Sequence, residues 1–187
     1  GRRKGDPILV SATCRVEAPA SLGDLLRGAG MAGAPWALIE QPDRGARGIL
    51  ALCAATTIPI GAAPRQRFTE LSARWNDLAR QAAADPAGGI PGAGLILIGG
   101  AAFAPGGGTG STWKGFGQGD MVVPSVTVAT CDGQAALTVT LLVSPDDDPV
   151  EVLAAAQLST ALLVPAPAAP ADPFLPAPDV QSVLAAD

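Results

Sequence analysis

The 187-residue chain has 12 Lys and Arg against 17 Asp and Glu, a net charge of −5 that excludes the basic surface typical of nucleic-acid binding. Its hydrophobic content of 48% is typical of a globular protein and argues against disorder. No apolar run approaches the roughly 18 residues that a membrane-spanning helix needs, so no membrane segment is predicted.

The three cysteines indicate a reducing compartment. Cys14, Cys53 and Cys131 are odd in number, widely spaced and set within apolar runs. This pattern favours reduced, buried thiols over a disulfide framework. The N-terminus also lacks the apolar segment of a signal peptide, and we therefore expect a cytoplasmic protein.

The first elements are a strand and a short helix. Residues 8–16 alternate, which predicts a half-buried strand with one apolar and one mostly polar face. The apolar face consists of Ile8, Val10, Ala12, Cys14 and Val16. Ser21 then fits a helix N-cap with Asp24 at the third position, and Gly28 ends the helix after about two turns.

Residues 36–41 and 48–54 are two apolar runs that flank a Pro-Asp-Arg-Gly turn, and they predict a hairpin. Glu40 and Asp43 are the nearest approach to a carboxylate pair in the chain. We interpret them as charges on an exposed turn that pair with Arg44 or Arg47.

Residues 67–84 give the clearest helical pattern. Apolar side chains recur at intervals of three and four, which predicts a helix with one face in the core. These side chains are Phe68, Leu71, Trp75, Leu78 and Ala82.

The stretch from Gly94 to Pro149 organises the chain. The apolar run 95–98 predicts a strand buried on both faces, and the following glycine pair indicates a bulge or a close backbone approach. Residues 105–119 form a glycine-rich loop. Residues 121–130 and 134–143 alternate around Cys131-Asp132-Gly133, which predicts a hairpin.

Asp148 and Pro149 predict the start of a helix that runs to about residue 163. Its expected inward face consists of Val150, Leu153, Ala154, Leu158, Ala161 and Leu162. The acidic run 146–148 could instead suggest a cation site, but it lacks the alternating ligands of a calcium loop. Residues 165–178 are rich in proline and alanine and predict an extended linker, and residues 179–187 look like the start of a further element.

The sequence lacks the common catalytic constellations. It has no histidine, which excludes imidazole catalysis and His-metal sites, and it has no Cys-x-x-Cys or Gly-x-Ser-x-Gly motif. The loop 106–114 is not a phosphate-binding loop, because Lys114 follows a tryptophan instead of the last glycine. We assign no catalytic, cofactor-binding or metal-binding residue to the chain.

The order of scaffold motifs between residues 99 and 149 resembles that in the N-terminal half of bacterial isochorismate synthases, within the chorismate-utilising enzyme family. The matching residues are Gly99, Gly100, Phe103, Pro105, Trp113, Gly115, Phe116, Pro124, Asp132, Gly133, Leu137, Thr138 and Ser144 to Pro149. The resemblance extends back through Trp75 and residues 40–45.

This resemblance implies an α+β fold: a largely antiparallel sheet with packing helices, part of a two-lobed α/β sandwich. Residues 1–164 would be an N-terminal scaffold lobe, 165–178 a linker and 179–187 the start of the catalytic half. In the family that half binds chorismate and Mg2+, and in isochorismate synthases a lysine there activates water while a glutamate protonates the departing hydroxyl. The expected partners of the chain are therefore chorismate, as substrate of the whole enzyme, and its own C-terminal half.

Two alternatives remain. A sister enzyme that makes anthranilate, aminodeoxychorismate or salicylate is the nearer one; the Leu-Leu-Glu-Ser-like element frequent in anthranilate synthases is absent here. The other is a freestanding, non-catalytic binding module on the same scaffold. The pathway served, menaquinone or siderophore synthesis, does not follow from these residues. The chain alone is expected to be inactive and to expose a large apolar surface.

Overall fold

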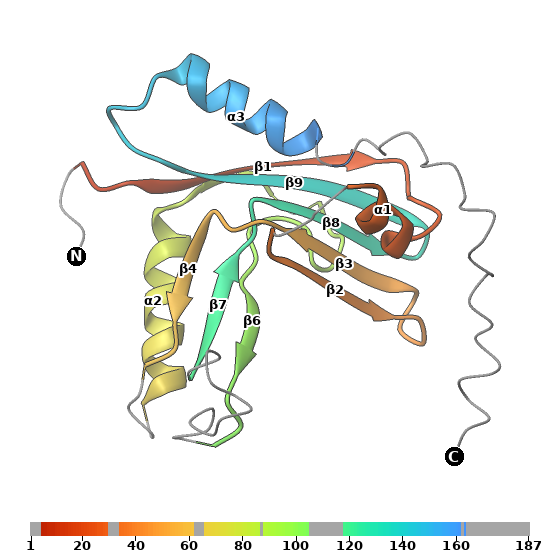
Figure 1. Ribbon diagram of the computed structural model, residues 1–187, viewed down its shortest axis with the longest axis horizontal. Coiled ribbons are helices and arrows are strands. Elements are labelled where there is room, and N and C mark those ends of the chain that lie inside the picture. Colours follow the sequence, from red (N-terminus) through yellow and green to blue (C-terminus); the bar gives the residue numbers. More distant parts are fainter. Residues whose placement is uncertain are drawn as a thin grey trace, which may run out of the picture.

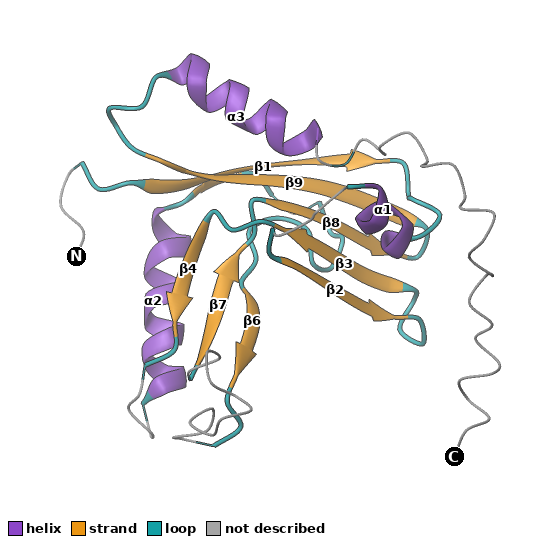
Figure 2. Cartoon of the chain, in the orientation of Figure 1, coloured by secondary structure: helices purple, strands orange, loops and turns teal. Residues whose placement is uncertain are grey.

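The computed structural model describes residues 5–29, 34–61, 66–86, 88–104, 118–161 and 163. Its elements in chain order are β1 (Ile8–Val16), α1 (Leu22–Gly28), β2 (Trp36–Gln41), β3 (Arg47–Leu52), β4 (Thr56–Pro59), α2 (Arg67–Gln81), β5 (Ala83–Ala84), β6 (Ile98–Ala101), β7 (Gly119–Val123), β8 (Val126–Cys131), β9 (Gln134–Val143) and α3 (Pro149–Ala161) (Figures 1 and 2). Residues 105–117 of the predicted glycine-rich loop, Leu162 of the predicted inward helix face, the predicted linker 165–178 and residues 179–187 lie outside these residues.

The strands form two sheets. The main sheet has the order β2-β3-β8-β9-β1-β5, and the small sheet has the order β4-β7-β6. Every neighbouring pair is antiparallel except β1 and β5. Figure 1 shows α3 above β1 and β9, and α2 alongside β4 of the small sheet. The expected α+β class with largely antiparallel strands is confirmed.

Pro124 divides the strand that the alternating pattern predicts over 121–130. The chain leaves the small sheet after Val123 and enters the main sheet at Val126. Proline cannot donate a ladder hydrogen bond, so the pairing ends there. The Ser125 carbonyl accepts a hydrogen bond from Thr140 N at 2.8 Å, which anchors the crossing to β9.

The predicted turn between β8 and β9 is confirmed. Asp132 and Gly133 both have positive φ, 50° and 73°, as a two-residue hairpin turn of the primed type requires. The predicted β2–β3 hairpin also forms. The backbone N–H of Asp132 donates to the Gly45 carbonyl at 2.8 Å, so the tips of the two hairpins are tied together.

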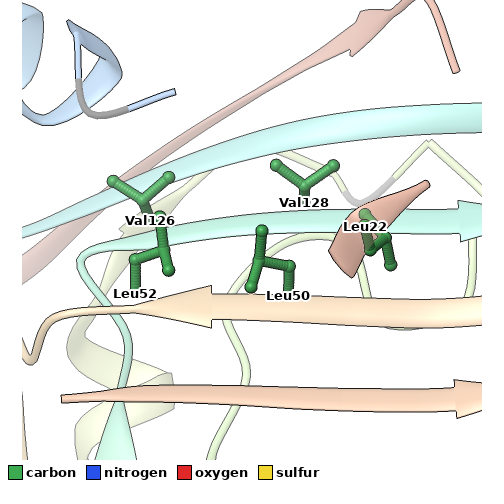
Figure 3. Packing of buried hydrophobic residues seen from close by; sticks show 5 residues of the cluster. All are labelled: Leu22, Leu50, Leu52, Val126 and Val128. Atoms are coloured by element: carbon green, nitrogen blue, oxygen red, sulfur yellow. The ribbon is translucent and has the colours of Figure 1, made fainter. Parts of the chain in front are cut away.

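One face of the main sheet, here called the helix face, carries the larger core. Leu50 and Leu52 of β3 lie beside Val126 and Val128 of β8, and Leu22 of α1 lies at the end of this row (Figure 3). Each such buried side chain contributes roughly 1.5–3 kcal/mol. The predicted N-cap positions α1, because the Ser21 hydroxyl accepts from Asp24 N at 3.2 Å.

The opposite face, here called the hydroxyl face, is lined by small and hydroxyl-bearing side chains. Thr140 Oγ1 donates to Ser11 Oγ at 3.1 Å, and the hydroxyls of Thr13 and Thr138 lie 3.1 Å apart. Ile90 and Ala93, which follow α2 and β5 in the chain, pack on this face.

The burial of β1 is the reverse of the prediction. Leu9 and Ser11 on the hydroxyl face are buried, whereas Ile8, Cys14 and Val16 on the apolar helix face are exposed. Alternation shows that two faces differ but not which one finds a partner. The hydroxyls tolerate burial because they bond one another across β1 and β9.

Replacing Thr138 tests how much this hydroxyl network contributes to the stability of the fold. Its Oγ1 accepts a buried hydrogen bond from Gly94 N at 2.9 Å, and the side chain is 1% exposed. Thr138→Val leaves that N–H unpaired and is expected to lower the free energy of unfolding by about 1–3 kcal/mol. Denaturant titration measures the change. Thr57→Val, at an exposed position of β4, should change it by less than about 0.5 kcal/mol.

The strand predicted over 95–98 is largely wrong. Only Ile98 of that run enters β6, which continues to Ala101 as an exposed edge of the small sheet. The close backbone approach predicted for the glycine pair is confirmed at Gly99, where a Cβ would lie 2.2 Å from the Asp120 carbonyl oxygen.

The helix predicted over 67–84 ends earlier, at Gln81. Ala83 and Ala84 are extended and pair in parallel with β1, so the end of the predicted helix becomes an edge strand. The expected core face is confirmed only in part: Leu71 and Trp75 are half-buried, but Phe68 is 52% exposed.

Candidate functional site: an apolar surface and a buried arginine

The candidate carboxylate groups do not form a catalytic site. Glu40 and Asp43 are exposed at the β2–β3 hairpin, and neither forms an ion pair with Arg44 or Arg47, contrary to expectation. Two carboxylates of the acidic run 146–148 accept hydrogen bonds from nearby backbone N–H groups. Asp148 Oδ1 accepts from Val150 N at 2.8 Å, which confirms the predicted cap of α3, and Asp147 Oδ2 accepts from Ser144 N at 2.7 Å.

Within the described ranges, no three Cys, Asp or Glu side chains come together in a way that could hold a metal ion. The Mg2+ that the family resemblance implies therefore finds no fitting ligand set there. The described helices likewise include none long and apolar enough to cross a bilayer.

An open groove of about 910 Å3 lies between β4 and α2. Thr56, Thr57 and Pro59 line one side, and Arg74 and the Asp77–Arg80 ion pair line the other. Its charges are mixed and exposed, which gives no convergent set for a reaction.

The most unusual surface belongs to α3. None of its residues is buried, although most of its side chains are apolar. Val150, Leu153 and Leu158, expected to face inward, are 73%, 59% and 72% exposed, so that prediction is wrong. The half-buried positions are instead Val152, Ala156, Ser159 and Thr160. A helix that is apolar on all sides is normally buried.

Exposed apolar side chains also occur on β1. Leu163, just beyond α3, packs with the helix-face core, so α3 covers that face of the main sheet. The outer side chains of β1 on the same face remain open, including Ile8 and Val16 at 37% exposure and Cys14. The prediction of buried thiols is therefore wrong for Cys14; Cys53 is half-buried, Cys131 is buried and all three are free. We call α3 and this side of β1 the apolar surface. Large exposed apolar patches commonly mark interaction sites.

A buried arginine lies at the start of α2. Arg67 is 5% exposed, its Nη2 donates to the Phe103 carbonyl at 3.0 Å, and its guanidinium carbon lies 4.6 Å from the centroid of the Phe68 ring. Its Nη1 is buried without a hydrogen-bond partner. Sequence reasoning missed this residue. The available signal was its spacing, four residues before Leu71, which places a cation on the apolar stripe of the helix.

The family-motif residues that the structure describes occupy scaffold positions, whereas Pro105, Trp113, Gly115 and Phe116 lie outside the described residues. Gly99 and Gly100 form the centre of β6, Pro124 separates the two sheets, and Asp132 and Gly133 form the β8–β9 turn. Residues at these positions stabilise the fold and do not indicate which reaction the protein catalyses.

Comparison with known proteins agrees with this fold. A search of curated proteins finds no match. Among solved structures, the fold is similar to one described as MenF, the menaquinone-specific isochorismate synthase from Escherichia coli, with a TM-score of 0.51 and 17% identity over 89% of this chain. The match covers 31% of the MenF chain, so this chain corresponds to less than a third of its length. Residues 2–178 match the family described as chorismate binding enzyme, and the chain therefore belongs to that family.

Proposed function

We propose that the protein carrying this chain is an isochorismate synthase and that the chain supplies its N-terminal scaffold lobe. The main support for this proposal is the family match over residues 2–178, together with a fold similar to that of MenF. The reaction would isomerise chorismate by adding water at C2 and expelling the C4 hydroxyl.

The apolar surface supports the scaffold part of the proposal. The described residues hold neither a metal-binding cluster nor a paired-carboxylate site, but they do present an apolar helix with three large exposed side chains. The catalytic lysine, the glutamates and Mg2+ are assigned to the part of the enzyme outside this chain. The chain contributes the sheets and the packing face on which that part rests.

The test is the product formed from chorismate by the protein at its native length. With Mg2+ and an amine donor present, we expect a product of the same mass as chorismate, with no release of pyruvate. An amino product would assign the protein to the anthranilate or aminodeoxychorismate enzymes. Pyruvate with salicylate would assign it to the salicylate synthases. No consumption of chorismate would refute the enzyme proposal and favour a freestanding module.

A further inference from the structure

Among the described strands, β2 is the sheet edge least protected against pairing with a further strand. The other outer strands are β5 of the main sheet and β4 and β6 of the small sheet. β5 has only two residues, β4 carries Pro59, which has no N–H to donate, and β6 contains two glycines among four residues. β2 has six residues without proline or glycine, and Glu40 is its one charged residue. Short strands, prolines and charges normally prevent edge pairing, so β2 is the edge best suited to receive a strand.

The pairing of β2 with β3 shows which backbone groups of β2 are open. The Cys53 N–H donates to the Pro35 carbonyl at 2.8 Å, and this pair continues the β2–β3 register. Because bonded and non-bonded positions alternate along an antiparallel pair, every second residue of β2 directs its N–H and C=O groups away from β3. These outward residues are Trp36, Leu38 and Glu40. No strand in the described part of the chain pairs with this side of β2, which is the outermost strand beside β3 in Figure 1.

Exposed apolar side chains lie on both faces of β2. Trp36 pairs with Leu52 of the helix-face core, and Ile39, three residues further along, lies on the hydroxyl face. The two side chains are 56% and 43% exposed. A helix or loop packed on one face of the sheet would cover only one of them. A strand added at the edge supplies side chains to both faces and also bonds the open backbone groups, so the edge favours a strand as its partner.

We infer that β2 pairs with a strand from the catalytic part of the enzyme, so that the main sheet continues beyond this chain. The inference rests on the proposed function, in which that part lies outside the chain. The chain corresponds to less than a third of the MenF chain, so a protein of similar length has ample further sequence to supply the strand. A strand of the same polypeptide is favoured over β2 of a second copy, because pairing within one polypeptide avoids the entropy cost of association and a six-residue edge is small for a stable dimer.

Amide hydrogen exchange in the native-length protein, resolved to single residues, tests this pairing. The N–H groups of Ala37 and Ile39 point toward β3 and serve as internal controls. If β2 is paired on both sides, the outward N–H groups of Trp36, Leu38 and Glu40 should exchange within about tenfold of these controls. Outward N–H groups that exchange on the order of a hundredfold faster than the controls would overturn the inference. Protection that is lost on dilution of the protein would assign the edge to a second copy and would also overturn it.

Glu40→Pro in the native-length protein removes one outward donor, and Glu40→Ala is the matched control that removes the side chain but keeps the N–H. The Glu40 side chain is exposed, and proline is tolerated where an edge N–H faces solvent. With the added strand in place, Glu40→Pro should melt at least about 2 °C below Glu40→Ala and should speed exchange of the Leu38 N–H on the order of tenfold. Equal melting temperatures and exchange rates of the two variants would contradict the pairing.

The two readouts do not depend on turnover of chorismate. Protected outward N–H groups in a protein that does not consume chorismate would refute the proposed function and retain the strand pairing. Open outward N–H groups in a protein that forms isochorismate would overturn the strand pairing alone.

Discussion

Replacing Gly119 by alanine is expected to lower the free energy of unfolding by at least about 3 kcal/mol. Gly119 begins β7 with φ 113°, a conformation that side chains rarely adopt. A Cβ there would lie 2.1 Å from the Gly100 carbonyl oxygen and 2.7 Å from Ala101 Cα. Both contacts are backbone atoms of β6, so the small sheet has to separate to accept the methyl group. Denaturant unfolding measures the loss.

Gly100→Ala is the matched control, because nothing lies within 4 Å of a Cβ at that position. The same added methyl group, on the neighbouring strand of the same pair, should change stability by less than about 1 kcal/mol. Equal effects of the two substitutions would show that the close approach of β6 and β7 is not what requires glycine.

The double substitution Leu153→Lys and Leu158→Lys on α3 is expected to reduce self-association of the 187-residue chain but to destabilise the native-length protein. In the 187-residue chain both side chains are exposed, so lysine should reduce self-association at little cost in stability. In the native-length protein the same positions are expected to lie in the packing face, where unpaired charges cost several kcal/mol. Sedimentation of the chain and thermal unfolding of the native-length protein give the two results.

Gln157→Lys controls for the added charge, because Gln157 is an exposed polar residue of the same helix. Gln157→Lys should leave the self-association of the 187-residue chain unchanged and should lower the stability of the native-length protein only slightly. If the double variant is as stable as wild type at native length, α3 faces solvent there and the proposed packing face is wrong.

Local signals predicted the elements well. The Ser21 cap, the Asp148 cap, the Asp132-Gly133 turn and the bounds of β1 all follow from chemistry within a few residues, and the structure confirms them. The division at Pro124 was also signalled by the proline, but alternation continues across it and hides the change of sheet.

The direction in which each element faces was harder to predict, since it depends on partners distant in sequence. For β1, the hydroxyls of Thr138 and Thr140 make the polar side the buried one. For α3, most positions are apolar, so periodicity could not identify the side that meets β9. Arg67 escaped notice because a charged residue at a helix start is ordinarily exposed.

Cys14 offers the most direct test of the claim that this chain is a scaffold lobe covered by the rest of an enzyme. Its thiol is exposed on β1 within the apolar surface, while Cys131 is buried in the main sheet. Alkylation followed by mass spectrometry should show rapid labelling of Cys14 in the 187-residue chain and labelling on the order of tenfold slower at native length. Cys131 should react slowly in both. Equal labelling of Cys14 in the two proteins would contradict the account, because the apolar surface would then be open in the complete protein.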